Sequence, residues 1–192
     1  MHRHHESASP MPGIAVLLVA AALAAVGGPA AESAGDEPGT AVARPKLATG
    51  LAPETAAAAM TVPPGFSVKL LAAEPDVRQP IAMCFDDRGR LWVAEAYSYP
   101  QRVEPDKARD RILIFEDTDG DDTLDSRKVF IEGLNLVSGL AVGFGGVWVG
   151  AAPELLFIPD ADHDDIPDGK PRVLLDGWGW QDTHETLNAF IW

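Results

Sequence analysis

The sequence predicts an all-β protein, because short apolar segments of strand length alternate with turns over most of the chain. No window of about twelve residues shows the period of an amphipathic helix. A second observation is that the strand pattern repeats. The expected strands cover residues 66–72, 81–87, 91–96, 111–117, 126–134, 140–144, 147–152, 154–160 and 171–177.

The repeat consists of four strands. LWVAEA at 91–96 and VWVGAA at 147–152 each follow a turn and hold a tryptophan at the second position. RILIFED at 111–117 is matched by ELLFIPD at 154–160, about 45 residues later. A four-stranded unit of this length is typical of a β-propeller blade. The alternative is an open β-sandwich, which the internal repeat disfavours.

Two such units do not close a ring, because propellers contain typically four to eight blades. The last residues, NAFIW at 188–192, match the first strand of a third unit. We therefore expect a fragment, the N-terminal part of a propeller over residues 61–192, with two blades and the start of a third.

The N-terminus predicts export. Residues 13–26 are apolar and uncharged, with Arg3 before them and small residues after them, which is typical of a signal peptide over residues 1–31. The protein is then periplasmic or associated with the cell envelope. Membrane association through an uncleaved segment is the alternative, although the run is shorter than the ~20 residues of a spanning helix. Residues 32–60 have a linker composition, which predicts disorder.

The net charge of −14 makes a nucleic-acid partner improbable, because phosphate binding needs a basic face. Much of the negative charge lies in two short stretches, 116–125 and 160–168. Clustered carboxylates of this kind indicate cation sites. Cys84 is the single cysteine, so an internal disulfide is excluded.

Both acidic stretches place aspartate at positions 1, 3, 5 and 9 of a loop, and the carbonyl at position 7 can add an oxygen. Calcium takes six to eight such hard oxygen ligands. An acidic, solvent-exposed turn is the alternative, and the second loop is expected to be the weaker site because His163 replaces a glycine. The predicted calcium ligands are Asp117, Asp119, Asp121, Thr123, Asp125, Asp160, Asp162, Asp164, Ile166 and Asp168.

The stretch 177–192 holds the candidate catalytic residues. His184 lies among tryptophans and acidic residues, and a neutral imidazole beside a carboxylate can act as a general base. Asp182 is the expected orienting carboxylate. The alternative is a purely structural histidine.

The combined motifs resemble a bacterial family. They are PPGFSVKLLAAEP, IAMCFDDRGRLWVAEAYSYP, RILIFEDTDGDDTLDSRKVFIEGLN and WGWQDTHETLNAFIW. Together they are similar to the planctomycete-type membrane-bound dehydrogenases, whose N-terminal propeller is in turn similar to soluble quinoprotein glucose and sorbosone dehydrogenases.

The resemblance implies an exported quinoprotein-type dehydrogenase that oxidises a sugar or alcohol, with pyrroloquinoline quinone as cofactor and His184 as the base. Haem would be involved through a cytochrome domain outside this chain, and the electron acceptor is left open. The alternative is a calcium-stabilised propeller that binds polysaccharide or protein without catalysis.

Overall fold

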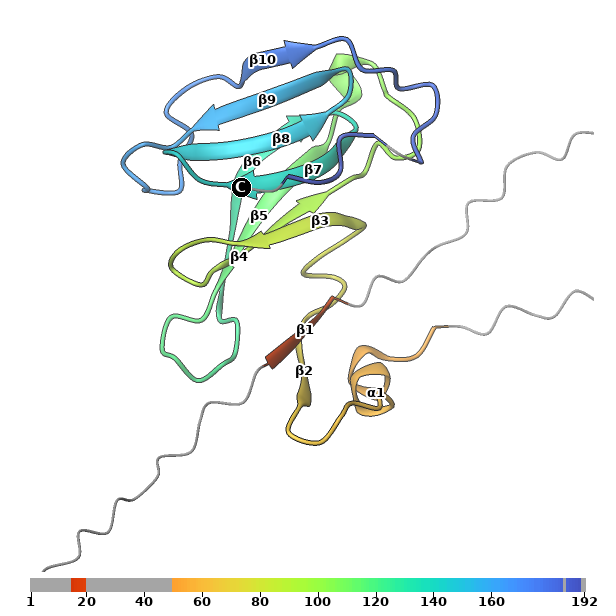
Figure 1. Cartoon of the computed structure of the whole chain (residues 1–192), viewed down its shortest axis with the longest axis vertical. Helices are drawn as coiled ribbons and strands as arrows, with labels where there is room; N and C mark the ends of the chain where they lie inside the picture. Colours follow the sequence, from red (N-terminus) through yellow and green to blue (C-terminus); the bar gives the residue numbers. More distant parts are fainter. Residues whose placement is uncertain (1–14, 20–49, 185, 191–192) are drawn as a thin grey trace, which may run out of the picture.

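The computed structural model describes residues 15–19, 50–184 and 186–190, and this part of the chain is built mainly from β-strands (Figure 1). A short helix, α1 (Pro53–Ala58), and a 3-10 turn at Pro105–Lys107 are the helical elements within these ranges. The strands are β1 (Ala15–Val19), β2 (Ser67–Ala72), β3 (Pro80–Phe85), β4 (Leu91–Glu95), β5 (Asp110–Glu116), β6 (Ser126–Leu134), β7 (Val137–Val142), β8 (Gly146–Ala151), β9 (Glu154–Pro159) and β10 (Arg172–Asp176).

Eight of these strands form two antiparallel four-stranded sheets, which confirms the all-β prediction. Sheet I has the order β3-β4-β5-β6 and sheet II the order β7-β8-β9-β10. The predicted strand 140–144 is shifted, since β7 covers Val137–Val142. It ends early because Phe144 and Gly145 adopt positive φ angles of 57° and 75°, which make the turn into β8.

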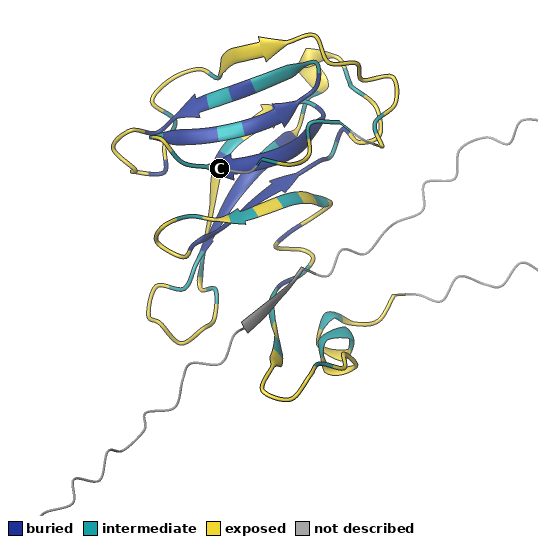
Figure 2. Ribbon diagram, in the orientation of Figure 1, coloured by how far each residue is buried: buried dark blue, intermediate teal, exposed yellow. Residues whose placement is uncertain are grey.

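The two sheets pack face to face around one apolar core (Figure 2). Trp92, Ile112 and Ile114 of sheet I are at most 1% exposed there. Val149 and Ile158 of sheet II meet them from the other side. Burial of these side chains against each other is the main source of stability for the junction.

The far face of sheet I is covered by the end of β2 and the chain that follows it. Ala72 and Val77 pack on Leu91, Val93 and Leu113 in a second cluster. β4 is therefore buried on both faces, so its first four residues, Leu91 to Ala94, form a continuous apolar run rather than an alternating one, and only the buried Glu95 at its end is charged.

The N-terminal predictions fall largely outside the described residues. Within the predicted signal peptide, 1–31, the structure describes β1, which pairs in parallel with β2. The predicted linker, 32–60, holds helix α1 near its end, and residues 32–49 are not described. Within the described ranges, no helix has the length and apolar character needed to cross a membrane.

The described part of the C-terminal segment, 177–184 and 186–190, returns to the start of β7. Thr183 Oγ1 donates to the carbonyl of Pro100 (3.0 Å), and Ser138 Oγ donates to the carbonyl of Leu187 (3.0 Å). Gly139 and Gly150 permit this approach, because a Cβ at either position would overlap the Leu187 carbonyl. The predicted third-unit strand over 188–192 is absent at 188–190, and residues 191–192 are not described.

Candidate functional site

The first acidic loop, 117–125, joins β5 to β6 and is exposed. Asp117 accepts the backbone N–H groups of Gly120 (2.7 Å) and Asp122 (2.7 Å), so its carboxylate is satisfied by its own loop. Carboxylate oxygens of Asp117, Asp119 and Asp125 lie within 4.8 Å of one another. The loop therefore brings together three of its predicted ligands, while the alternative of a solvent-exposed acidic turn describes it equally well.

The other two predicted ligands of this loop serve its internal structure. Asp121 Oδ1 accepts the backbone N–H of Thr123 (2.7 Å). Lys69 Nζ donates to the carbonyl of Asp121 (3.2 Å) and to Thr123 Oγ1 (3.4 Å). Asp121 and Thr123 thus shape the turn and tie it to β2.

The second acidic loop, 160–168, joins β9 to β10 and differs in one respect. Carboxylate oxygens of Asp160, Asp162 and Asp164 again lie within 4.8 Å of one another. Asp160, however, is only 4% exposed, and its Oδ1 atom is buried without a hydrogen-bond partner. An unpartnered buried carboxylate oxygen costs roughly 1–3 kcal/mol, and a bound cation would supply the missing contact.

The surroundings of Asp160 disfavour its negative charge. Burial raises the pKa of Asp160, and the charge of Asp165 raises it further, while His163 and the Asp164 backbone act in the opposite direction. A cavity of about 310 Å³ between the turns 86–90 and 143–146 is bordered by both Asp160 and His163. Carboxylates converging beside such a cavity fit a hard divalent cation.

The remaining predicted ligands of the second loop lie in its closing turn. Asp168 Oδ2 accepts the N–H of Ala161 (2.7 Å), and Asp164 Oδ1 accepts the N–H of Ile166 (2.8 Å). His163 stands at the position of Gly120 in the first loop and adopts a left-handed φ of 59°, close to the 77° of Gly120, so the two loops share this backbone conformation. The buried carboxylate oxygen without a partner thus lies in the second loop, the one expected from sequence to be the weaker site.

Asp165 is a residue that sequence reasoning missed. It is 8% exposed and pairs with Arg90 Nη1 (2.7 Å), Lys128 Nζ (2.6 Å) and Arg88 Nη2 (3.4 Å) of sheet I. Burial acts to raise the pKa of Asp165, but the hydrogen bonds and charges of Lys128 and Arg90 outweigh it and lower that pKa. The contact fastens the second acidic loop to the neighbouring sheet.

The predicted catalytic pair lies at the surface. His184 Nδ1 and Asp182 Oδ1 are 2.6 Å apart, and Asp182 also accepts the His184 backbone N–H (3.1 Å). The hydrogen bond from His184 lowers the pKa of Asp182. Both side chains are more than 80% exposed. The structure thus places the two residues in contact, as expected, but at a solvent-exposed position.

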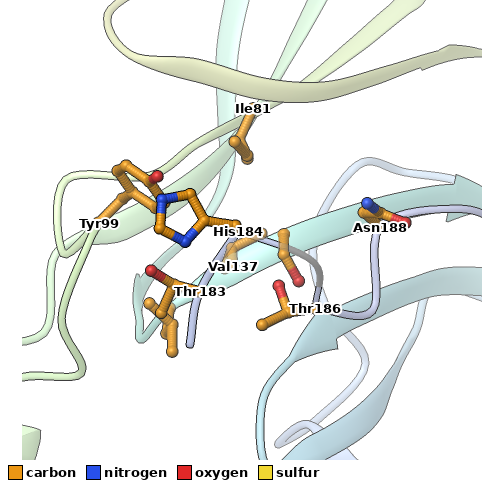
Figure 3. Close-up of a pocket in the computed structure, with 9 residues that line it drawn as sticks. Ile81, Tyr99, Val137, Thr183, His184, Thr186 and Asn188 are labelled. Atoms are coloured by element: carbon orange, nitrogen blue, oxygen red, sulfur yellow. The ribbon is translucent and has the colours of Figure 1, made fainter. Parts of the chain in front are cut away.

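His184 borders a cavity of about 130 Å³, where its ring lies beside Tyr99 (Figure 3). The lining combines apolar side chains with hydroxyl and amide groups, a composition typical of a small-ligand site. The lining residues are Ile81, Tyr99, Leu136, Val137, Ser138, Thr183, His184, Thr186 and Asn188.

This lining does not fit pyrroloquinoline quinone. The quinone is a tricarboxylate, and buried or half-buried carboxylates need cationic or multiple N–H partners. No arginine or lysine is among the nine described residues that form the cavity. The cavity instead fits a small neutral ligand with hydroxyl groups.

The fold and these sites define a protein of two stacked antiparallel sheets with acidic loops at one end and a histidine-lined cavity. The family model for a domain of unknown function, DUF7133, matches residues 52–192, and the chain belongs to this family. No curated protein and no solved structure matches the chain. The matched range includes helix α1, both sheets, both acidic loops and the cavity at His184.

Proposed function

We propose that sheets I and II are successive blades of a β-propeller. The support is that equivalent faces of the two sheets point in the same direction. Trp92 faces sheet II, whereas Trp148, its counterpart in the repeat, faces away from sheet I. A stack in which each sheet presents the same face to the next is how blades are arranged around a ring.

The charged contacts support the same arrangement. Lys128 lies opposite Ile114 in sheet I, and Arg172 lies opposite Phe157 at the matching place in sheet II. Asp122 holds the position in the first loop that Asp165 holds in the second, and both have positive φ angles, 65° and 69°. Each sheet thus has a basic residue on its outer strand, at the position of Lys128, and an aspartate in its acidic loop, at the position of Asp165. The Lys128–Asp165 contact could therefore recur between further sheets of a stack.

The cation proposed for the second loop is calcium. The observation that carries this assignment is the buried, unpartnered Oδ1 of Asp160 among the carboxylates of Asp162 and Asp164. Three carboxylates converging on one point repel each other unless a cation neutralises them. Calcium suits such a site because it accepts oxygen ligands in flexible geometry.

Replacing Asp160 with asparagine is expected to abolish calcium binding at this loop and, without calcium, to raise stability by about 1 kcal/mol at neutral pH. Isothermal titration calorimetry and urea unfolding, each with and without calcium, measure the two effects. Asp176→Asn is the charge-matched control, because Asp176 lies at the far end of β10, opposite Glu154. Unchanged calcium heats in Asp160→Asn would refute the site.

The stability gain should depend on pH. Because the pKa of Asp160 is raised in the folded state, the folded protein holds this proton more tightly than the unfolded chain does. The loss of folding stability caused by ionised Asp160 is complete above the raised pKa, and it vanishes as pH falls toward the ordinary pKa of 3.8. The advantage of Asp160→Asn should therefore shrink on acidification.

For activity, we propose oxidation of a sugar or alcohol hydroxyl at the cavity beside His184, in an exported protein of the dehydrogenase type. The observation that carries it is the 2.6 Å contact between Asp182 and His184 Nδ1. Asp182 accepts a hydrogen bond from the protonated Nδ1 of His184, which leaves Nε2 free to accept the hydroxyl proton of the ligand. Ser138, Thr183 and Asn188 supply hydrogen-bonding partners for the other hydroxyls. The hydride passes to a two-electron acceptor bound outside this lining.

Replacing His184 with glutamine is expected to lower turnover by about 10²–10⁴-fold, the usual contribution of a general base. The assay uses a panel of sugars and alcohols with a two-electron dye as acceptor. Thr186→Val, on the same lining, is the matched control for cavity shape and should change mainly the KM. Turnover of His184→Gln within a few-fold of the parent protein would rule out the proton-accepting role.

A calcium-stabilised binding module for polysaccharide or protein is the second candidate. The specific observation in its favour is that His184 and Asp182 are 83% and 81% exposed, which suits a contact surface better than a water-excluded catalytic site. Saturable sugar binding in calorimetry without dye reduction would favour the module, and reduction that depends on His184 would favour the enzyme.

A further inference from the structure

The β9–β10 loop carries two sets of acidic groups that face different partners. Asp160, Asp162 and Asp164 converge, and the Oδ1 atom of Asp160 has no partner. Asp165, the next residue, is instead buried against Arg90 next to sheet I. We propose that a cation bound by the three converging carboxylates tightens the junction between the two sheets through Asp165. This inference rests on the calcium site proposed above.

The Asp165 contact spans the sheet junction. Arg90 and Asp165 are buried, with side chains 3% and 5% exposed. Lys128, on the edge strand of sheet I, also pairs with Asp165, and its side chain is 49% exposed. The other acidic group on Arg90 is Asp86, whose Oδ2 lies 2.8 Å from Nε. Arg88 joins from the same turn. Sheet I therefore supplies three cations and one anion to this corner, and the loop supplies Asp165.

The converging carboxylates and Asp165 are connected through the backbone of the loop. Asp164 and Asp165 are neighbours in the chain, and both His163 and Asp165 hold left-handed backbone angles that leave the segment few alternatives. Arg88 Nη2 also donates to the carbonyl of His163 (3.4 Å). Any rearrangement that separates the repelling carboxylates therefore moves Asp165 relative to Arg90. A cation that holds the carboxylates together holds the Asp165 contact as well.

Loop tethering and simple electrostatics predict opposite results for one substitution. Lys128 is a positive charge near the proposed cation, so its removal should tighten calcium binding if charge alone matters. If Lys128 instead anchors the loop through Asp165, its removal should weaken calcium binding. Coupling between linked sites typically changes affinity by at least about fivefold.

The experiment is calorimetric titration of calcium into the full chain and into Lys128→Gln. We expect Lys128→Gln to bind calcium at least about fivefold more weakly. Lys170→Gln is the matched control: it removes the same charge near the same loop, where Lys170 is exposed, and should not weaken binding. Equal or tighter binding in both variants would overturn the inference while leaving the calcium site intact.

Coupling must be reciprocal, which gives a second readout. Calcium should slow amide hydrogen exchange in β7 and β4 of the parent protein, and the slowing should be lost in Asp165→Asn. Equal slowing in both proteins would overturn the inference. If the parent protein shows no calcium heat that depends on Asp160, the proposed site itself is wrong, and the inference falls with it.

Discussion

Replacing Trp92 with alanine is expected to lower the free energy of unfolding by about 3–5 kcal/mol, the usual cost of deleting a large buried aromatic. Trp92 is 1% exposed and packs edge-on against Phe130, with ring centroids 5.0 Å apart. Its Nε1 donates to Asp86 Oδ2 (2.9 Å), and Arg90 lies 5.6 Å from the ring centroid. The substitution removes core volume and polar contacts together.

Trp148→Ala is the matched control, because Trp148 is the repeat counterpart on the other sheet. It also packs edge-on, against Phe157 (5.1 Å), and donates to the carbonyl of Gly143 (3.2 Å). Unlike Trp92, it is partly exposed. Urea unfolding of both variants should show a clearly smaller loss for Trp148→Ala. Equal losses would mean that the junction between sheets I and II does not dominate stability.

Replacing Asp110 with alanine is expected to cost about 3 kcal/mol or more, because several buried donors lose their acceptor at once, each at roughly 1–3 kcal/mol. Asp110 is fully buried and accepts the Ser98 N–H (2.7 Å), the Ser98 hydroxyl (2.6 Å) and the Val137 N–H (2.9 Å). Ser98 Oγ in turn accepts the N–H of Leu136 (2.7 Å). One carboxylate thus joins the loop after β4 to the start of β7.

The control for Asp110→Ala is Ser98→Ala, which leaves the Val137 and Ser98 N–H groups bonded to Asp110. We expect it to cost about 1–2 kcal/mol in the same urea experiment. Since Tyr99 and Val137 line the cavity beside His184, Asp110→Ala should also weaken any ligand binding measured there. A loss for Asp110→Ala no larger than that for Ser98→Ala would contradict this account.

The strands were predictable because local patterns determine them. β6, for example, has the bounds expected from sequence, Ser126–Leu134, because polar and turn residues precede it and Gly133 lies at its end. The equivalence of Trp92 and Trp148 correctly grouped the strands into two sheets of four. Where the prediction shifted, at β7, the cause was the backbone conformation of Phe144, which composition does not show.

The candidate sites were predictable only in part. The spacing of aspartates identified both acidic loops, and two such loops look alike in sequence. Burial separates them, because Asp117 is half-buried and its carboxylate is hydrogen-bonded by its own loop, whereas Asp160 is buried and its Oδ1 has no partner. The lining of the cavity beside His184 also required the fold, since Ile81, Tyr99 and Val137 are far from it in sequence.

By itself the sequence determined the all-β class, the four-strand repeat, the positions of the acidic loops and the pairing of Asp182 with His184, all of which depend on residues within about ten positions of each other or on repetition. The tertiary structure alone decided which loop carries a buried carboxylate oxygen without a partner, that Asp165 reaches Arg90 and Lys128, and that Asp110 joins the two sheets. The physical reason is that the energy of a charge depends on its desolvation and on partners brought close by folding, and neither is encoded in the local pattern.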